Sequence, residues 1–398
     1  MKVLISGASI TGPALAFWLH RSGAEVTVVE RAPGLRPGGQ AVDVRGVAKE
    51  AVRRMGLAEQ VRAACTATGG LSLVDGTGRR VASMTVGQFG GDGLIAEIEI
   101  LRGDLSQVLY DVTKDNTEYV FGDRITAMDE QPDGVHVTFA VGAPRVFDVV
   151  IGADGLHSGV RSLQFGETPL HHLGSYLSFW TVRNHLDLKN WALVYTEPGR
   201  SLGVRTINGN RNLMAFAAVR AGEIDYDHRD TGKQKELIRE RLAGMGWDVA
   251  TFVDQLDAAP DFYFDSSSQV TLDSWSRGRV GLLGDAAFCS SPSSGQGTSL
   301  ALVGAYVLAG ELAACGGDYA AGLAAYERRL RPWVLANQKL GRDYSTTTVP
   351  LTERGIRLQR LAMRALRYLP TKLLSRKSAK VLNGFELPDY PLDRATVA

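Results

Sequence analysis

Hydrophobic residues near the start of the chain form two short runs with a helical pattern between them. The runs at 2–6 and 26–30 are rich in valine, leucine and isoleucine, which is typical of buried parallel strands. Between them, apolar residues recur at helical spacing over 13–21, and Pro13 suits the first turn of a helix. The order strand, helix, strand predicts a βαβ unit with a parallel sheet.

The hydrophobic period changes several times along the rest of the chain. Helical spacing recurs over 47–55, 103–113 and 233–257, and from residue 295 onward. Alternation typical of half-buried strands recurs at 70–101, 118–121, 125–131, 135–140, 176–182, 192–195, 202–207 and 213–219. We expect the apolar segments 146–151 and 279–283 to rejoin the first sheet as buried strands.

This order of elements predicts an α/β fold in which two domains are interleaved rather than placed in tandem. A discontinuous Rossmann-like domain is expected from the segments 1–70, 100–174 and 271–340. An antiparallel-sheet domain is expected from 71–99 and 175–270. The remaining residues, 341–398, are expected to form a C-terminal helical cap.

Composition agrees with a cytoplasmic protein. At 398 residues, the chain has room for two or three domains of about 150 residues each. The net charge of +1 argues against general nucleic-acid affinity. We expect no signal peptide, because the N-terminus enters a strand directly, and no transmembrane segment, because the apolar run at 300–310 is short.

Cysteine and histidine spacing predicts no metal site. The three cysteines, Cys65, Cys289 and Cys315, lack the spacing of a metal or redox motif, which fits a reducing compartment. The seven histidines form no ligand pattern either, and we interpret His171 and His172 as a polar turn.

The turn between the first strand and its helix has the sequence GASITG at 7–12. In a βαβ unit, such a turn directs backbone N–H groups at the helix N-terminus toward a pyrophosphate. Gly7 permits the tight turn, Gly12 permits close packing, and Ser9 replaces the usual middle glycine. Glu30 ends the second strand near the usual spacing of a ribose-binding acid, which favours FAD or NAD over NADP. A glycine-rich turn without a ligand is the alternative.

Two further glycine-rich segments follow other predicted strands. Residues 152–161 read GADGLHSGVR and contain Asp154, and residues 281–297 contain both GLLGDAA and PSSGQG. Asp285 directly follows a buried strand, where a carboxylate can accept hydrogen bonds from ribityl hydroxyls. The N–H groups around Gln296 open the next predicted helix, which favours an anionic group there. Plain strand–turn–helix junctions are the alternative.

In this order and spacing, the three segments resemble the FAD-dependent aromatic hydroxylases of the p-hydroxybenzoate hydroxylase type, the class A flavin monooxygenases. The resemblance covers about residues 1–340, and it implies an FAD-binding domain interleaved with a substrate domain. Overall length is most similar to that of the tetracycline-inactivating monooxygenases and the polyketide-tailoring hydroxylases, which implies a polycyclic substrate and a role in antibiotic biosynthesis or inactivation. Phe288 stands where many members have histidine, and Thr298-Ser299 where many have an asparagine.

The resemblance and the motifs together nominate residues for each part of the site. The candidates for binding FAD are Gly7, Ser9, Gly12, Glu30, Arg31, Asp43, Arg45, Arg102, Asp154, Asp285, Pro292, Gly295, Gln296, Gly297 and Thr298. Arg36 is the candidate for NADPH. The candidates for the substrate are Phe179, Trp180, Arg205, Met214 and Phe216. Solvated arginines and ordinary sheet packing are the alternatives, and no catalytic base is nominated.

The resemblance implies a complete reaction. NADPH or NADH binds transiently and reduces FAD, dioxygen forms a flavin C4a-hydroperoxide, and an aromatic ring is hydroxylated. Two other functions use the same motifs: an FAD-dependent reductase or dehydrogenase that does not use oxygen, and a non-catalytic FAD-binding protein. We expect a monomer or a homodimer.

A basic, amphipathic helix is predicted over 353–369. Its arginines at 354, 357, 360, 364 and 367 lie opposite Leu358, Leu361, Ala365 and Leu366. One interpretation is a helix on a membrane surface or an acidic partner. The other, which the near-zero net charge favours, is a helix that caps the substrate domain and exposes its basic face.

Overall fold

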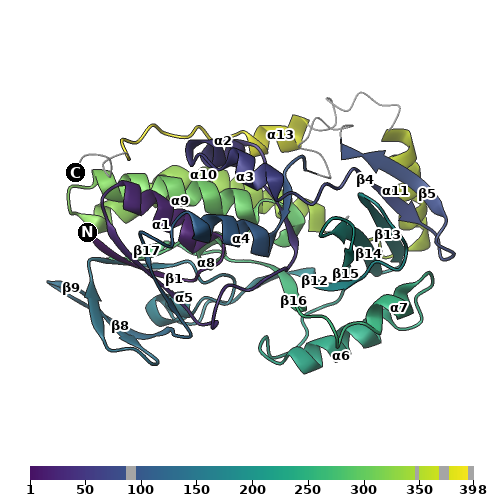
Figure 1. Cartoon of the computed structure of the whole chain (residues 1–398), viewed down its shortest axis with the longest axis horizontal. Coiled ribbons are helices and arrows are strands. Elements are labelled where there is room, and N and C mark those ends of the chain that lie inside the picture. The colour runs from purple at the N-terminus through teal and green to yellow at the C-terminus, as the bar shows by residue number, and fades with distance from the viewer. Residues whose placement is uncertain (87–95, 346–348, 367–375, 393–398) are drawn as a thin grey trace.

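The computed structural model describes residues 1–86, 96–345, 349–366 and 376–392. A parallel sheet with its helices lies at one end of an elongated molecule, and a larger sheet lies at the other (Figure 1). The chain passes between these two sheets several times. We propose that they mark the two domains expected from the sequence.

The predicted βαβ unit is the centre of a six-stranded sheet. Its strand order is β17 (Ser276–Arg277), β18 (Val280–Leu282), β11 (Val149–Gly152), β1 (Lys2–Ser6), β2 (Glu25–Glu30) and β7 (Glu118–Phe121). All neighbouring pairs are parallel except β17 with β18. The sheet therefore joins strands from three distant parts of the chain, as the apolar runs predicted.

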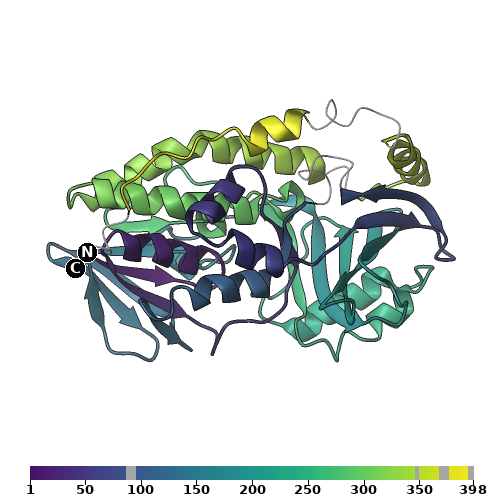
Figure 2. The same ribbon diagram turned by 45° about the horizontal axis from the view of Figure 1, so that its top comes forward.

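Helices cover this sheet. They are α1 (Thr11–Arg21), α2 (Val47–Arg54), α3 (Ala58–Ala63), α4 (Arg102–Asp111), α5 (Gly159–Phe165), α8 (Asp285–Phe288), α9 (Gly297–Ala314) and α10 (Tyr319–Ser345). Figure 2 shows α10 lying along the outside of α9. Among the described residues, only α9 is long and apolar enough to cross a membrane, but 78% of it is buried inside the protein. It packs against α1, α2 and α10 as a core helix does.

The segment 146–151 was predicted as one strand, and the structure divides it at Asp148. Residues before the break form β10 (Arg145–Phe147), which pairs with β9 (Gly134–Phe139) and β8 (Ile125–Gln131) in a separate antiparallel sheet. The Asp148 carboxylate accepts a hydrogen bond from the backbone N–H of Lys2 at 2.6 Å. This contact lies at the point where the chain leaves one sheet and enters the other.

The second large sheet has seven strands. Their order is β16 (Tyr263–Gln269), β12 (His171–Arg183), β15 (Asn212–Arg220), β14 (Arg200–Ile207), β13 (Trp191–Glu197), β4 (Gly70–Val74) and β5 (Arg80–Thr85). The prediction of an antiparallel sheet holds for every pair except β13 with β4, which is parallel. His171 and His172, which we interpreted as a turn, belong to β12 and pair with Gln269 and Ser268.

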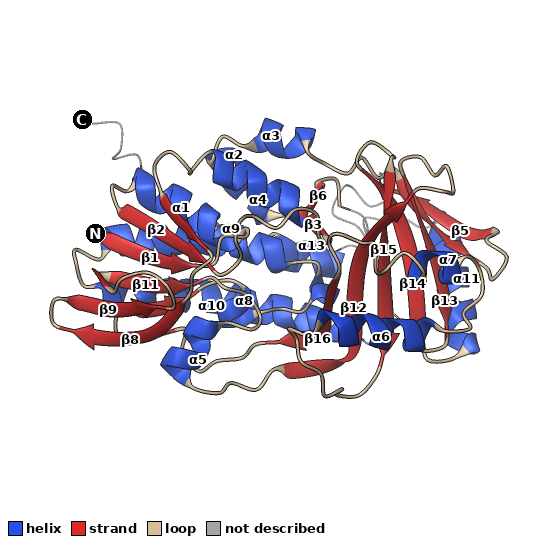
Figure 3. Ribbon diagram, turned by 60° about the horizontal axis from the view of Figure 1, so that its bottom comes forward, coloured by secondary structure: helices blue, strands red, loops and turns tan. Residues whose placement is uncertain are grey.

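The two faces of this sheet have different neighbours (Figure 3). One face is covered by α6 (Thr231–Leu242) and α7 (Val249–Val253), which the sequence predicted as one helix over 233–257. Gly244, at φ +72°, lies in the break between them. The opposite face is directed toward the first sheet.

Trp180 lies on the helix-covered face, and this corrects its prediction as a substrate residue. Its side chain is fully buried, and its indole N–H donates to the carbonyl of Phe252 at 3.0 Å. Phe179 points the other way, because successive side chains of a strand alternate between faces. Trp180 is therefore a core residue.

The C-terminal basic helix forms, but its apolar side differs from the prediction. It is α11 (Glu353–Leu366), which lies on β5 and β13 and buries Ile356 and Met363. Leu358 and Leu361, expected to face inward, are 67% and 62% exposed. Arg364 donates to the carbonyl of Val81 at 2.6 Å. Arg367 lies outside the described residues, and the chain resumes at α13 (Arg376–Leu382) beside α10.

Replacement of Trp180 by phenylalanine tests this assignment. We expect Trp180→Phe to lower the free energy of unfolding by about 1–3 kcal/mol, because the Phe252 carbonyl loses its buried donor. Urea denaturation measures this change. An unchanged unfolding free energy would contradict the assignment of Trp180 to the core.

Candidate functional site

The turn between β1 and α1 leaves a helix N-terminus open. A β-carbon at position 12 would lie 1.9 Å from the carbonyl oxygen of Gly7, so only glycine allows the turn to close this tightly. The helix begins without a side-chain cap and has no acidic residue in its first turn. Its first N–H groups lack intrahelical acceptors and carry partial positive charge, which suits a pyrophosphate.

Glu30 lies beside this turn at the end of β2. Its two carboxylate oxygens accept from the backbone N–H groups of Ala8 and Ala32, both at 2.9 Å. A carboxylate has about four lone-pair sites, so two hydrogen bonds leave capacity for hydroxyl donors. The structure therefore brings Glu30 to the loop where a ribose-binding acid is expected.

Arg102 lies on the other side of the turn. Its guanidinium donates to the Ser9 hydroxyl at 3.0 Å and to the carbonyl of Arg36 at 3.3 Å. Burial and the nearby Arg36 lower the pKa of Arg102 to about 10. Arg36 and Arg31 are exposed, so either side chain is accessible to an anionic group from solvent.

The second glycine-rich segment organises the start of α5. The Asp154 carboxylate accepts from the N–H groups of Gly159 at 2.8 Å and Val160 at 3.2 Å, and also from the Ser158 hydroxyl. Burial raises the pKa of Asp154. Arg161 donates to the carbonyl of Ala286 at 2.9 Å, which ties this segment to the third one.

The third segment places an acid and a second open helix N-terminus together. Asp285 is the first residue of α8, and burial raises the pKa of its carboxyl group. Pro292 begins a short 3-10 turn, and α9 then starts at Gly297 with no side-chain cap and no acid in its first turn. The side-chain oxygen of Gln296 is buried and has no hydrogen-bond partner in the described structure.

Asp43 and Arg45 reach this region from β3 (Ala41–Asp43). Their side chains form an ion pair at 2.7 Å, and the N–H of Arg45 donates to the Ser299 hydroxyl on α9 at 3.1 Å. Burial raises the pKa of Asp43, although Arg45 opposes the shift. A β-carbon at Gly295 would lie only 3.6 Å from the Asp43 carboxylate. Residues more than 250 positions apart therefore meet at the start of α9.

Four of the five substrate candidates share the sheet face directed toward the first domain. Phe179 is paired with Phe216 in the register of β12 and β15, and Met214 is paired with Arg205 across β15 and β14. The Arg205 guanidinium lies 5.4 Å from the centre of the Phe216 ring. The face therefore combines aromatic and thioether surface with a cation.

Sequence reasoning missed the partner of Arg205, which is Glu99 on β6 (Glu99–Leu101). Glu99 is 7% exposed and also accepts from Thr66 at 2.7 Å and Thr68 at 3.0 Å. Burial opposes its ionisation, but Arg205 and the two hydroxyls outweigh burial, so the pKa of Glu99 is lowered. Alternation gave no signal, because Glu97 and Glu99, two positions apart, would share one face of a regular strand, yet Glu97 is exposed and Glu99 is buried.

These features fit FAD better than a smaller ligand. Two open helix N-termini suit a pyrophosphate at one end and an electron-rich ring at the other. The unpartnered side-chain oxygens of Gln40 and Gln296 supply buried acceptors for a hydrogen-bonding ring. Within the described parts of the chain, no group of three or more histidine, cysteine or acidic side chains is arranged to hold a metal ion.

Comparisons with known proteins identify an FAD-binding family. The model of the family described as FAD binding domain matches residues 1–338. An uncharacterised protein of Mycobacterium tuberculosis is 45% identical, with 88% of this chain and 95% of that protein covered. A flavin-dependent monooxygenase of Legionella longbeachae is 38% identical, with 86% and 88% covered.

Solved structures agree with the fold. The crystal structure of tetracycline destructase Tet(51) matches with a TM-score of 0.86 and 33% identity, covering 98% of this chain and 99% of that one. Klebsiella pneumoniae HpxO, solved with FAD and uric acid, matches with a TM-score of 0.77 and 21% identity over 98% of each chain. At that identity, HpxO supports the fold alone.

Glu99 offers a test of the buried ion pair. We expect Glu99→Gln to lower the free energy of unfolding at neutral pH by about 3–5 kcal/mol, because it leaves Arg205 buried without its carboxylate. The contribution of Glu99 is present above its ordinary pKa of 4.5 and is lost as the pH falls through the lowered folded-state value. Denaturation across this pH range therefore gives converging curves for wild type and variant.

The matched control is Glu97→Gln. The Glu97 side chain is 62% exposed and pairs with Lys49 at the surface, so its loss changes stability by about 0–1 kcal/mol. Equal losses of unfolding free energy in the two variants would show that the buried ion pair stabilises the fold no more than the surface pair does.

Proposed function

Because this chain belongs to the FAD binding domain family, and within it to the class A flavin-dependent monooxygenases, we propose that it hydroxylates a phenolic, polycyclic small molecule. The electron donor is NADPH, and the oxygen atom comes from dioxygen. The observation that carries this proposal is the sheet face with Phe179, Met214, Phe216 and Arg205, directed toward the domain with the glycine-rich turns. A flavin bound at those turns supplies hydride acceptance and oxygen activation.

The residues around the turns have separate roles toward FAD. The N–H groups at the start of α1 bind the pyrophosphate, and Glu30 binds a ribose. Asp285 accepts from the ribityl chain. The open N-terminus of α9 would favour negative charge on a flavin ring held beside it.

Substrate recognition uses the apolar wall and the charges beside it. Phe179, Met214 and Phe216 bind an aromatic ring system through apolar contact. Arg205 is held by Glu99, so its guanidinium is oriented before a substrate arrives. A phenolate next to Arg205 is stabilised, and this makes the ring more electron-rich for attack by an electrophilic oxygen.

Asp43 is our candidate for the proton acceptor from the phenol. Burial raises its pKa, so its carboxylate binds a proton more readily than an exposed aspartate does. The pairing with Arg45 opposes this shift and fixes the orientation of the carboxylate. No candidate for this role was apparent from the sequence.

Access to the site is provided by a cavity of about 530 Å³ at the junction of the two sheets. It is bordered by Pro37 and Gly38 of the loop that carries Arg36, and by Leu101, Thr181 and Ile207. Leu101 and Ile207 also pack against Met214, which with Phe179 and Phe216 forms what we call the substrate wall. We assign this cavity to entry of the substrate or the nicotinamide, and Arg36 to NADPH phosphate.

The polycyclic substrate class has independent support. Tetracycline destructase Tet(51) is 33% identical to this chain over nearly its whole length, and its name gives tetracycline as the compound on which that protein acts. We extend this to a role in antibiotic biosynthesis or inactivation, with the ring system and hydroxylated position to be identified by product analysis.

The first test concerns the cofactor. We expect the purified protein to be yellow, with FAD bound non-covalently and released intact by heat or acid. We expect Asp285→Ala to weaken FAD binding roughly tenfold, because a lost acceptor costs about 1–3 kcal/mol. Quenching of FAD fluorescence measures the affinity, and Asp111→Ala, an exposed aspartate on α4, is the control. Unchanged affinity in Asp285→Ala would refute the role of Asp285.

The second test concerns the reaction. We expect NADPH oxidation and oxygen uptake to rise together when a phenolic polycycle is added, and one atom of labelled dioxygen to enter the product. Turnover that proceeds equally without oxygen would indicate the reductase alternative. A protein that holds FAD but oxidises no NADPH with any phenolic substrate would indicate the non-catalytic alternative.

A further inference from the structure

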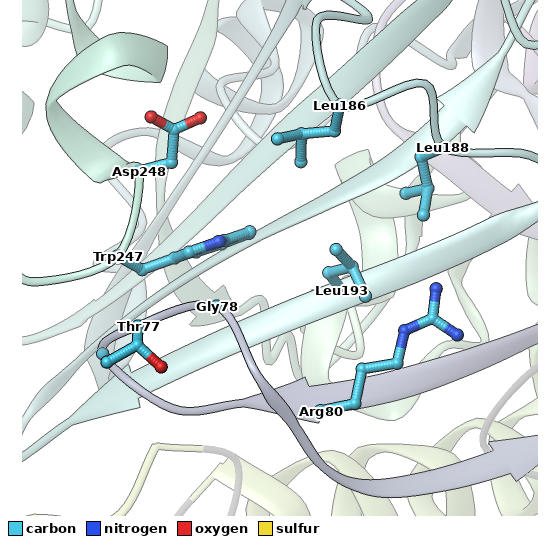
Figure 4. Close-up of a pocket in the computed structure, with 9 residues that line it drawn as sticks. Thr77, Gly78, Arg80, Leu186, Leu188, Leu193, Trp247 and Asp248 are labelled. Atoms are coloured by element: carbon cyan, nitrogen blue, oxygen red, sulfur yellow. The ribbon is translucent and has the colours of Figure 1, made fainter.

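A second cavity, of about 560 Å³, lies on the helix-covered face of the seven-stranded sheet (Figure 4). Its lining combines four apolar side chains with glycines and charged groups, and consists of Gly76, Thr77, Gly78, Arg80, Leu186, Leu188, Leu193, Trp247 and Asp248. Leu193 lies on this face of β13, and Val194 lies on the opposite face. The sheet itself therefore separates this cavity from the substrate wall.

The apolar part of the lining is large enough for an aromatic ring. Leu188 and Leu193 are 6% and 7% exposed, and Figure 4 shows Leu186 and the indole of Trp247 bordering the same space. Small-molecule sites occupy about 300–1,000 Å³ and are lined mainly by apolar and aromatic groups. The volume of this cavity lies in that range, and four of its nine lining residues have apolar or aromatic side chains.

The indole of Trp247 is held in place by its backbone. Trp247 has φ +55°, a left-handed conformation that is uncommon for a bulky residue. The backbone N–H of Trp247 donates to the carbonyl of Gly76 at 2.7 Å. The backbone N–H of the preceding residue, Gly246, donates to the Glu197 carboxylate at 3.0 Å. At Gly78, a β-carbon would lie 3.1 Å from the indole ring. The aromatic wall is therefore fixed before any ligand binds, which lowers the entropic cost of binding.

The charges at the cavity favour an anion. The Asp248 carboxylate is already engaged in a hydrogen bond with the His185 ring. The Arg80 guanidinium lies 5.5 Å from the centre of the Trp191 ring. Among the described residues, no carboxylate lies within ion-pair distance of Arg80. Figure 4 shows the Arg80 side chain extending toward Leu188, along one side of the cavity.

We propose that this cavity binds a small aromatic carboxylate at a site separate from the flavin. The ring packs against Trp247 and the three leucines, and the carboxylate pairs with Arg80, whose planar guanidinium suits bidentate binding of a carboxylate. The proposal does not rest on the hydroxylase function, because no residue of this cavity belongs to the flavin or substrate wall.

Binding of 3-phenylpropionate to the purified full-length protein tests the proposal. Calorimetric titration compares this acid with 3-phenylpropionamide, which has the same ring and no charge. We expect the acid to bind at one site per chain and at least about tenfold more tightly than the amide, the scale of a charge-assisted hydrogen bond. Equal affinities, or no binding of the acid at millimolar concentration, would overturn the proposal.

Variants locate the site. Arg80→Gln should weaken binding of the acid to the level of the amide, whereas Arg79→Gln should leave it unchanged, since Arg79 pairs with Asp75 outside the cavity. Trp247→Asn removes the indole but keeps a residue that tolerates the left-handed backbone, so the variant should fold and lose binding of both ligands. Binding that survives both Arg80→Gln and Trp247→Asn would place the acid elsewhere and refute the assignment.

Discussion

Close contact between backbone segments is the constraint on which the rest of this structure depends. A β-carbon at Gly7 would lie 2.6 Å from the carbonyl oxygen of Ala153, and one at Gly284 would lie 2.9 Å from the Thr11 hydroxyl. The three glycine-rich segments therefore meet where no side chain fits between them. This contact aligns the ends of β1, β11 and β18 at one edge of the sheet. We propose that the start of α1 and the acids that follow β11 and β18 face one cofactor from this edge.

The buried charges follow from this arrangement. Asp43 and Glu99 are directly opposite each other in the β3–β6 pair, where like charges repel. Arg45 pairs with Asp43 and Arg205 pairs with Glu99, so the positive charges of the group equal its negative charges. Buried ion pairs rarely stabilise a fold as well as apolar packing does. Because the two ion pairs lie beside the substrate wall, we infer that they serve recognition of the substrate rather than stability of the fold.

Much of the fold was predictable, because its strongest signals are local. The apolar runs on either side of GASITG predicted the βαβ unit, and alternating residues predicted most strands of the second large sheet. Contacts between distant segments were not predictable. Alternation shows that Phe179 and Trp180 face opposite ways, but it does not indicate which face meets the helices. In the same way, Glu99 is separated from Arg205 by 106 positions, and no local pattern pairs them. The cofactor and NADPH contacts of individual residues stay predictions.

The interleaved order of strands has a consequence for biosynthesis. The central strand β1 is translated before most of its neighbours, its sheet is completed by β18, and α9 follows still later. Such non-local pairing slows folding, and it leaves the first strands without their final neighbours while most of the chain is made. The cofactor site can therefore assemble only after Gly297, the first residue of α9, has left the ribosome. Until α9 packs, its apolar surface is available to chaperones or to aggregation.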